Sequence, residues 1–291
     1  MGAWSSGVAA AGFATMFYGL AVVMQKREAE RVEVGGVGIL GALARRPAWI
    51  AAIGIQVVGF AFHSYALTRA PIALVQPIIA SGVVFVVLFA YLLLDERPQR
   101  RELVGTALLI GGLALLVREL RGSAAIHDVV PQDLGLALGS CAALIAVLTG
   151  GGRFLGVGSG VAAVSLAGAA GLGQGMSDAM NRLVGAWLVP TRGWVPPAPM
   201  AMAAVLLLVA FGLQGLATAQ NALRVYRANT VVPCLVAAQL LVPIAMAQVV
   251  YGQDVRVVSD GALALAALGT FSGLLLLCTS PRVVSSVARS G

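Results

Sequence analysis

Long uncharged apolar runs make up most of this chain, and short polar segments between them carry nearly all the charged residues. A helix needs about 20 residues to cross the roughly 30 Å hydrocarbon core of a bilayer. Nine runs come close to this length or exceed it. They predict transmembrane helices over residues 4–24, 48–67, 71–94, 103–117, 134–151, 157–188, 200–223, 231–250 and 261–277. The apolar stretch 32–44 is too short to cross and is predicted to be interfacial or re-entrant.

Composition agrees with lipid as the solvent. Hydrophobic residues make up 59% of the 291 positions and charged residues 11%, whereas soluble domains carry about 25% charged residues. No positive segment precedes the first apolar run, so we expect a first span there rather than a cleaved signal peptide. The predicted fold class is an all-α membrane protein with about nine transmembrane helices. The expected location is the plasma membrane, as a multi-pass protein of a bacterium.

Orientation is predicted from the loops, because cytoplasmic loops are enriched in Lys and Arg. The loops after the first, third, fifth, seventh and ninth runs carry thirteen of the 19 Lys and Arg residues. These loops should lie in the cytoplasm, which puts the N-terminus outside and the C-terminus inside.

An internal repeat appears when the sequence is shifted by 156 positions without gaps. Gly19 then meets Gly175, Gly59 meets Gly215, and Gln25-Lys26 meets Asn181-Arg182. Pro77 also meets Pro233, and Gly105 meets Gly261. The competing explanation is a chance alignment of apolar helices. The shift spans an odd number of helices, so the second copy should cross in the opposite direction. We therefore predict two inverted halves, 1–118 with four helices and 119–291 with five.

Polar side chains inside spans are costly and usually face a cavity or a partner helix. Those near mid-span are neutral, and an amide can both donate and accept hydrogen bonds to a polar organic solute or headgroup. The alternative is that each amide holds two helices together. The predicted substrate-binding residues are Gln56, Ser81, Gln174, Gln214 and Gln239.

A second group of residues is predicted to serve as gates or in coupling. Asp178 and Arg182 share a helix face at spacing i, i+4, either as a gate or as a local salt bridge. Asp178 is the preferred proton-coupling residue, and His63 is another candidate because histidine titrates near neutral pH. Lys26 either belongs to a gate or extends its amine to the interface. The predicted gating or coupling residues are Lys26, His63, Asp178, Asn181 and Arg182.

Metals and cofactors are not expected. Cys141, Cys234 and Cys278 sit alone in apolar runs, without CxxC spacing or clustered histidine, and are interpreted as packing residues. The chain has no GxxxxGK[ST] motif for ATP and no Ser/His/Asp or HExxH constellation, so it is not predicted to be an enzyme. Its positive charges form no run, which argues against nucleic acid as a partner.

The stretch 66–117 resembles the drug/metabolite transporter superfamily. The residues that carry this similarity are Ala66-Leu67, Ala70-Pro71, Val75-Gln76-Pro77, Leu94-Asp95-Glu96-Arg97 and Glu102-Leu103-Val104-Gly105. Gly19 to Lys26-Arg27, and Gln220-Asn221-Ala222-Leu223 before Val231-Val232-Pro233, are similar to its EamA-like and NIPA-like branch. The resemblance implies a ten-helix pattern, or a nine-helix variant. NIPA-like proteins are associated with magnesium, but Asp178 is the only acid in the predicted spans, which argues against magnesium transport here.

The sequence therefore predicts a secondary transporter of a small polar solute that works by alternating access between its halves. Two alternatives stay open: a flippase for a lipid-linked headgroup, and a non-transporting subunit of an envelope-biosynthesis enzyme. Expected partners are the solute or headgroup, membrane lipids, and a second copy or another membrane protein.

Overall fold

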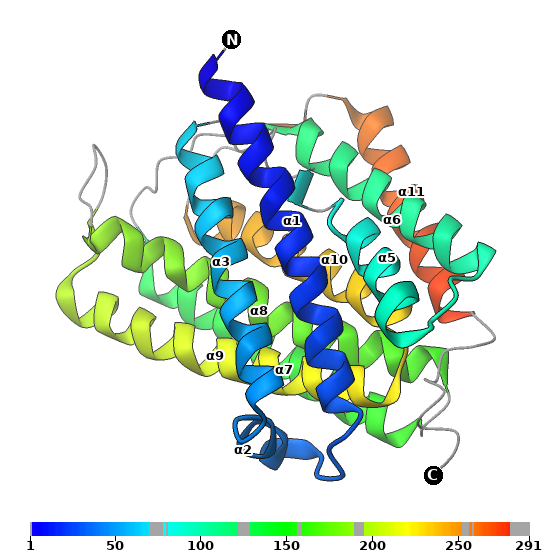
Figure 1. The fold of residues 1–291 in the computed structure, drawn as a ribbon. Coiled ribbons are helices and arrows are strands. Elements are labelled where there is room, and N and C mark those ends of the chain that lie inside the picture. The colour runs from blue at the N-terminus through cyan, green and yellow to red at the C-terminus, as the bar shows by residue number, and fades with distance from the viewer. Residues whose placement is uncertain are drawn as a thin grey trace.

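The computed structural model describes residues 2–69, 78–79, 81–121, 129–155, 159–188, 195–251, 256–257 and 259–279. Among these residues the fold is helical apart from two strands of two residues each (Figure 1). Strand β1 (Leu120–Arg121) pairs antiparallel with β2 (Arg256–Val257). This pair joins the segment after α6 to the segment before α11.

The N-terminal portion contains four long helices and a short connection. The long helices are α1 (Gly2–Ala29), α3 (Pro47–Arg69), α5 (Val83–Leu94) and α6 (Arg100–Glu119). The predicted interfacial stretch 32–44 forms the 3-10 turn η1 (Gly36–Gly38) and the five-residue helix α2 (Ile39–Leu43). It packs on α3 and α9 through Leu43, Trp49 and Leu216, at the end of α1 (Figure 1).

The predicted span 71–94 differs from the structure. Ser81 and Gly82 form a turn before α5 begins at Val83, so the described part of this run is not one continuous helix. Hydropathy cannot reveal such a break, because the residues on both sides of the turn are apolar. Residues 70–77, which include Pro71 and Pro77, lie outside the described residues.

Five long helices form the C-terminal portion, and each overlaps a predicted span. They are α7 (Pro131–Phe154), α8 (Gly160–Leu188), α9 (Ala198–Val225), α10 (Ala228–Val249) and α11 (Asp260–Cys278). In Figure 1, α8 and α9 lie side by side, as do α1 and α3, and α6 runs beside α11.

The chain is a multi-pass membrane protein. Four helical segments are long and apolar enough to cross a bilayer: Ser5–Ala29, Pro47–Ala66, Pro131–Gly152 and Ala198–Val225. Val83–Leu94, Ala228–Pro243 and Gly261–Leu277 are shorter apolar helices. Large apolar side chains such as Val57, Leu206 and Phe271 are more than half exposed, as expected for a surface covered by lipid.

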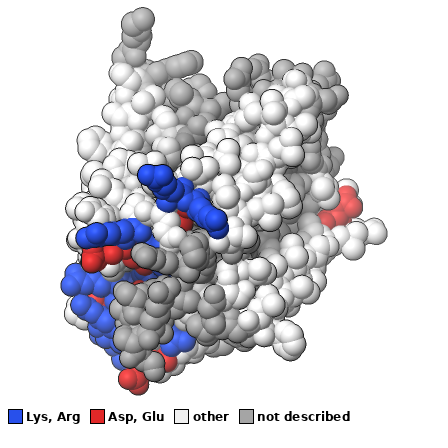
Figure 2. Space-filling model, turned by 90° about the vertical axis from the view of Figure 1, so that its right-hand side faces the viewer, with Lys and Arg blue, Asp and Glu red and all other residues white. Residues whose placement is uncertain are grey.

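The charged side chains that the structure describes lie mainly at one end. Figure 2 shows Lys and Arg gathered toward the lower left, with Asp and Glu among them, against a largely uncharged surface. The C-termini of α1, α5 and α9 and the N-termini of α6 and α10 meet at this end, which we call the basic end. Hydrogen bonds from Lys26 to Tyr226 and from Arg227 to Glu102 join these termini.

Equivalent glycines make equivalent contacts in the two portions. A β-carbon at Gly19 in α1 would lie 2.7 Å from Phe85 Cβ and 3.1 Å from the backbone nitrogen of Val86 in α5. A β-carbon at Gly175 in α8 would lie 2.8 Å from Val242 Cβ in α10. Gly175 and Val242 are the positions related to Gly19 and Val86 by the shift of 156 residues.

A second pair of contacts follows the same relation. A β-carbon at Gly59 in α3 would lie 3.0 Å from Tyr18 Cδ1 in α1. At Gly215 in α9 it would lie 2.8 Å from the backbone nitrogen of Gln174 in α8. Gln174 is the position related to Tyr18. Only glycine lets the helix backbones approach this closely, so the shared glycines give α1–α3 and α8–α9 similar packing.

Candidate functional site

The predicted substrate-binding residues do not form one hydrogen-bonded group. Gln56 accepts a hydrogen bond from Gln25, and Ser81 Oγ donates to the backbone oxygen of Ile78 at 2.6 Å. Gln174 and Gln214 lie at the α8–α9 interface, where Gln214 Nε2 donates to Thr218 Oγ1 at 3.0 Å. All five side chains, the four amides and the Ser81 hydroxyl, are partly exposed. Their role in binding stays a prediction.

Asp178 and Gln239 come together from α8 and α10. Gln239 Nε2 donates a hydrogen bond to Asp178 Oδ2 at 2.8 Å, and the Asp178 side chain is exposed although it lies in the interior of a long helix. Its role in proton coupling stays a prediction.

Tyr18 lies beside the predicted residue His63. Its hydroxyl lies 3.5 Å from His63 Nδ1, and the two rings stack edge to face with centroids 6.2 Å apart. His63 Nε2 is buried and has no hydrogen-bond partner among the described residues. We call Tyr18, His63, Asp178 and Gln239 the central group; Tyr18 contacts His63, and Gln239 contacts Asp178.

Two other predicted gating residues sit near Asp178 in the sequence. Asn181 is exposed on α8. Arg182 lies in the same helix, but its side chain is outside the described part of the chain, so the predicted pair with Asp178 is not tested. The charged group that the structure does describe lies instead at the basic end.

Lys26 is completely buried there, with 0% of its side chain exposed. Its ammonium donates to Glu30 Oε1 at 2.8 Å and to the backbone oxygens of Leu223 and Tyr226 at 2.9 and 2.8 Å. Carbonyls at the end of a helix lack intrahelical partners, and a cation is favourable beside them. Lys26 of α1 thus caps the C-terminus of α9, and its amine is enclosed by protein.

Glu96, which follows the end of α5, binds the turn between α9 and α10 where α10 begins. Its Oε2 accepts from the backbone nitrogen of Ala228 at 3.1 Å, at the positive N-terminus of α10. Its Oε1 lies 3.3 Å from Lys26 Nζ. The turn between α9 and α10 is therefore held at its start by α1 and at its end by α5.

Arg227 completes this arrangement from within the turn. It donates to Glu102 Oε1 at 2.7 Å and to the backbone oxygen of Arg97 at 2.6 Å. Arg227 and Glu102 are 7% and 1% exposed. We call Lys26, Glu30, Glu96, Glu102 and Arg227 the charge cluster. Buried ions are tolerated when they are paired and hydrogen bonded, as these are.

A chain of amides lies directly beside the charge cluster. Gln220 Nε2 of α9 donates to Gln25 Oε1 of α1 at 2.7 Å, and Gln25 Nε2 donates to Gln56 Oε1 of α3 at 2.6 Å. Gln25 and Gln220 are 3% and 1% exposed. The amide chain and the charge cluster together join the N-terminal and C-terminal portions at the basic end.

Sequence reasoning missed several of these residues. Glu102 and Arg227 were read only as loop or motif residues, because their partners lie on other helices far along the chain. Tyr18 was not singled out, although a signal for it was present: it is related to Gln174 by the shift of 156 residues.

Comparison with known proteins agrees with the resemblance found in the sequence. Residues 10–118 match the model of the EamA-like transporter family, which is consistent with the drug/metabolite transporter superfamily. A search of curated proteins and a search of solved structures each found no match. Proteins of this family are membrane transporters of small solutes.

Proposed function

Given this match, we propose that the chain is a secondary transporter that moves a small polar solute by alternating access, with the charge cluster as its gate at the basic end. The proposal rests on the complete burial of Lys26 between α1, α5 and the α9–α10 turn. A buried cation that joins the two portions keeps that end closed. Opening the end requires its hydrogen bonds to be broken together.

The substrate site of this transporter is the central group with the neighbouring amides Gln174 and Gln214. It offers one carboxylate, three amides that can donate and accept, and the ring faces of Tyr18 and His63. These groups suit a polar organic solute better than a bare divalent cation, which prefers several carboxylate oxygens.

Two inverted halves supply the motion in this proposal. The matching contacts Gly19–Val86 and Gly175–Val242, and Tyr18–Gly59 and Gln174–Gly215, support halves at 1–118 and 119–291. If one half rocks against the other, the central group is exposed first to one side and then to the other. The excess of Lys and Arg at the basic end supports a cytoplasmic position for it in a plasma membrane.

Transport by purified protein in liposomes tests the proposal. Metabolite and lipid-headgroup panels are first screened by thermal shift, because a ligand that binds only the folded protein raises its melting temperature. A stabilising solute is then measured for uptake by wild-type and Lys26→Met protein, with Arg97→Gln as the exposed control. We expect uptake by wild type and the control only. If a solute binds but the wild-type protein does not transport it into liposomes, the chain is a subunit or receptor. Translocation of a fluorescent lipid across the bilayer would instead support the flippase alternative.

A further inference from the structure

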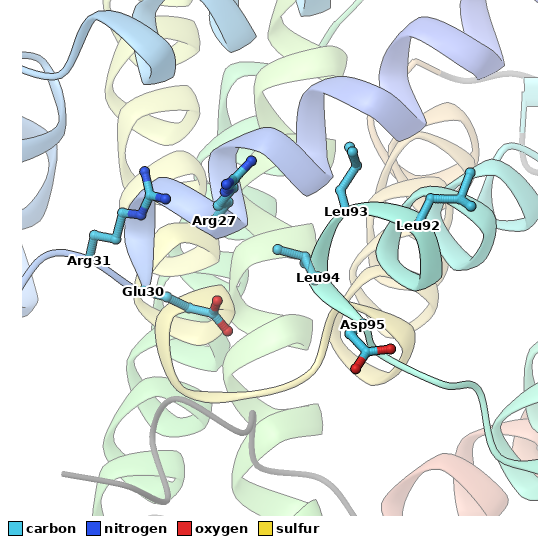
Figure 3. A pocket seen from close by; sticks show the side chains of 7 residues that line it. All are labelled: Arg27, Glu30, Arg31, Leu92, Leu93, Leu94 and Asp95. Carbon is cyan, nitrogen blue, oxygen red and sulfur yellow. The ribbon is translucent and has the colours of Figure 1, made fainter.

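A hollow opens at the basic end between α1 and α5. It has a volume of about 370 Å³ and contains no residue of the central group. Figure 3 shows two arginines and a glutamate on the α1 side, and the end of α5 opposite them. The lining residues are Arg27, Glu30, Arg31, Leu92, Leu93, Leu94 and Asp95.

Only two of the four charges in this hollow are free for a ligand. Arg31 pairs with Glu28 at 2.7 Å, and Glu30 accepts the hydrogen bond of Lys26 at 2.8 Å. Arg27 is exposed, and no ion pair to it is present among the described residues. The remaining free charges are one cation, Arg27, and one anion, Asp95.

The backbone turn at Asp95 explains why this carboxylate faces outward. Asp95 ends α5 in the left-handed conformation with φ 53°, which Asp and Asn tolerate better than most residues. The turn sends Glu96 into the charge cluster and leaves the Asp95 side chain 87% exposed. Its nearest cation, Arg97, is 3.9 Å away and equally solvated, so this pair contributes little.

An apolar surface runs along α5 from the hollow toward the membrane interior. Val84, Leu88, Tyr91 and Leu92 follow helical spacing on one face and are 63%, 46%, 48% and 61% exposed. A headgroup in the hollow would therefore have its acyl chain against an uncharged helix face. The charges and the apolar face belong to the same short helix end.

We propose that this hollow binds the headgroup of phosphatidylethanolamine. Arg27 donates hydrogen bonds to the lipid phosphate, because guanidinium groups suit phosphate oxygens. Asp95 accepts hydrogen bonds from the lipid ammonium, and one acyl chain lies along the exposed face of α5. A headgroup with one charge of each sign matches the free charges, whereas a purely anionic headgroup would face Asp95 without compensation.

Native mass spectrometry of the full-length protein tests this site with added dioleoyl lipids of three kinds: phosphatidylethanolamine, phosphatidylcholine and phosphatidylglycerol. Wild type should retain phosphatidylethanolamine about fivefold better than phosphatidylcholine, whose methylated ammonium cannot donate to Asp95. Arg27→Gln should lower retention of phosphatidylethanolamine about fivefold, the effect of one basic residue at an interface. Arg101→Gln, an exposed arginine outside the hollow, should leave it unchanged.

Asp95→Asn separates the amine contact from the turn, because Asn keeps the left-handed conformation and removes only the charge. Retention of phosphatidylethanolamine and phosphatidylcholine should become equal in this variant. Equal retention of these two lipids by wild type would overturn the proposal, as would stronger retention of phosphatidylglycerol that Asp95→Asn leaves unchanged. An equal effect of Arg27→Gln and Arg101→Gln would show general surface attraction and would also overturn it. None of these readouts depends on transport.

Discussion

The ammonium of Lys26 lies 3.3 Å from the carboxylate of Glu96, and together they hold both ends of one helix turn. Lys26 caps the end of α9, while Glu96 caps the start of α10. The two residues come from α1 and α5, in the N-terminal portion of the chain. The contact between the two portions at the basic end thus uses the unsatisfied backbone groups of helix termini.

Lys26→Met should destabilise the protein and abolish transport. The substitution leaves Glu30, Glu96 and two buried carbonyls without their cation, and removing one partner of a buried ion pair costs about 3–5 kcal/mol. Unfolding in a mixed micelle measures the loss of stability. Arg97→Gln, which removes a side chain that is 79% exposed, should change stability by less than about 0.5 kcal/mol. Equal stability of the two variants would contradict the structural role given to Lys26.

Gly19→Ala should destabilise the protein, whereas Gly12→Ala in the same helix should not. A β-carbon at Gly19 meets Phe85 at 2.7 Å, and one at Gly12 meets nothing within 4 Å. Overpacking costs about 1–3 kcal/mol, while Gly to Ala in a helix interior gains about 1 kcal/mol where space is free. Melting temperatures of the two variants should therefore move in opposite directions. A shift in the same direction would show that α1 does not pack closely on α5.

The amide chain should show energetic coupling between Gln25 and Gln220. Replacing either residue with Leu breaks the 2.7 Å hydrogen bond and leaves the other buried amide without this partner. The second replacement should therefore lower the free energy of unfolding by less than the first. A double-mutant cycle on unfolding free energies should give a coupling of about 1 kcal/mol. Additive effects would mean that the two residues do not act on each other, and that the amide chain does not join α1 to α9.

The features that could be predicted from the sequence are those that depend on residues close together in the chain. Each predicted span overlaps a described helix, because long apolar runs are a local signal. Residues related by the shift of 156 positions make similar contacts, since Gly19 of α1 packs on α5 and Gly175 of α8 packs on α10. The inverted arrangement of the two halves stays a prediction. The turn at Ser81–Gly82 was missed because apolar residues flank it.

The charge cluster could not be predicted in the same way. Lys26 looked like a residue that reaches the interface, because its partners Leu223 and Tyr226 are backbone groups almost 200 positions away. Backbone carbonyls leave no mark in composition, so nothing local to Lys26 indicates that it is buried. Glu96 lies in the Leu94-Asp95-Glu96-Arg97 motif, but its partners Lys26 and Ala228 are far from it in the sequence.

Asp178→Asn should remove the pH dependence of transport if this acid carries the coupled proton. The change keeps the hydrogen bond with Gln239 possible and removes only the titrating group. Asp133→Asn, which removes an acid in the first turn of α7 outside the central group, is the control. Uptake by proteoliposomes is measured across a pH series for wild type and both variants. Unchanged pH dependence in Asp178→Asn would rule out Asp178 as the coupling residue.

Access to the central group from each side of the membrane tests the central claim most directly. Gln239→Cys is placed in a chain whose three native cysteines are replaced by Ala, and oriented vesicles are treated with a membrane-impermeant thiol reagent from either side. With the charge cluster intact, we expect labelling only from the side opposite the basic end. Adding Lys26→Met should open the gate and allow labelling from the basic side. If Gln239→Cys is labelled from the same side of the membrane whether or not Lys26→Met is present, the charge cluster does not act as a gate.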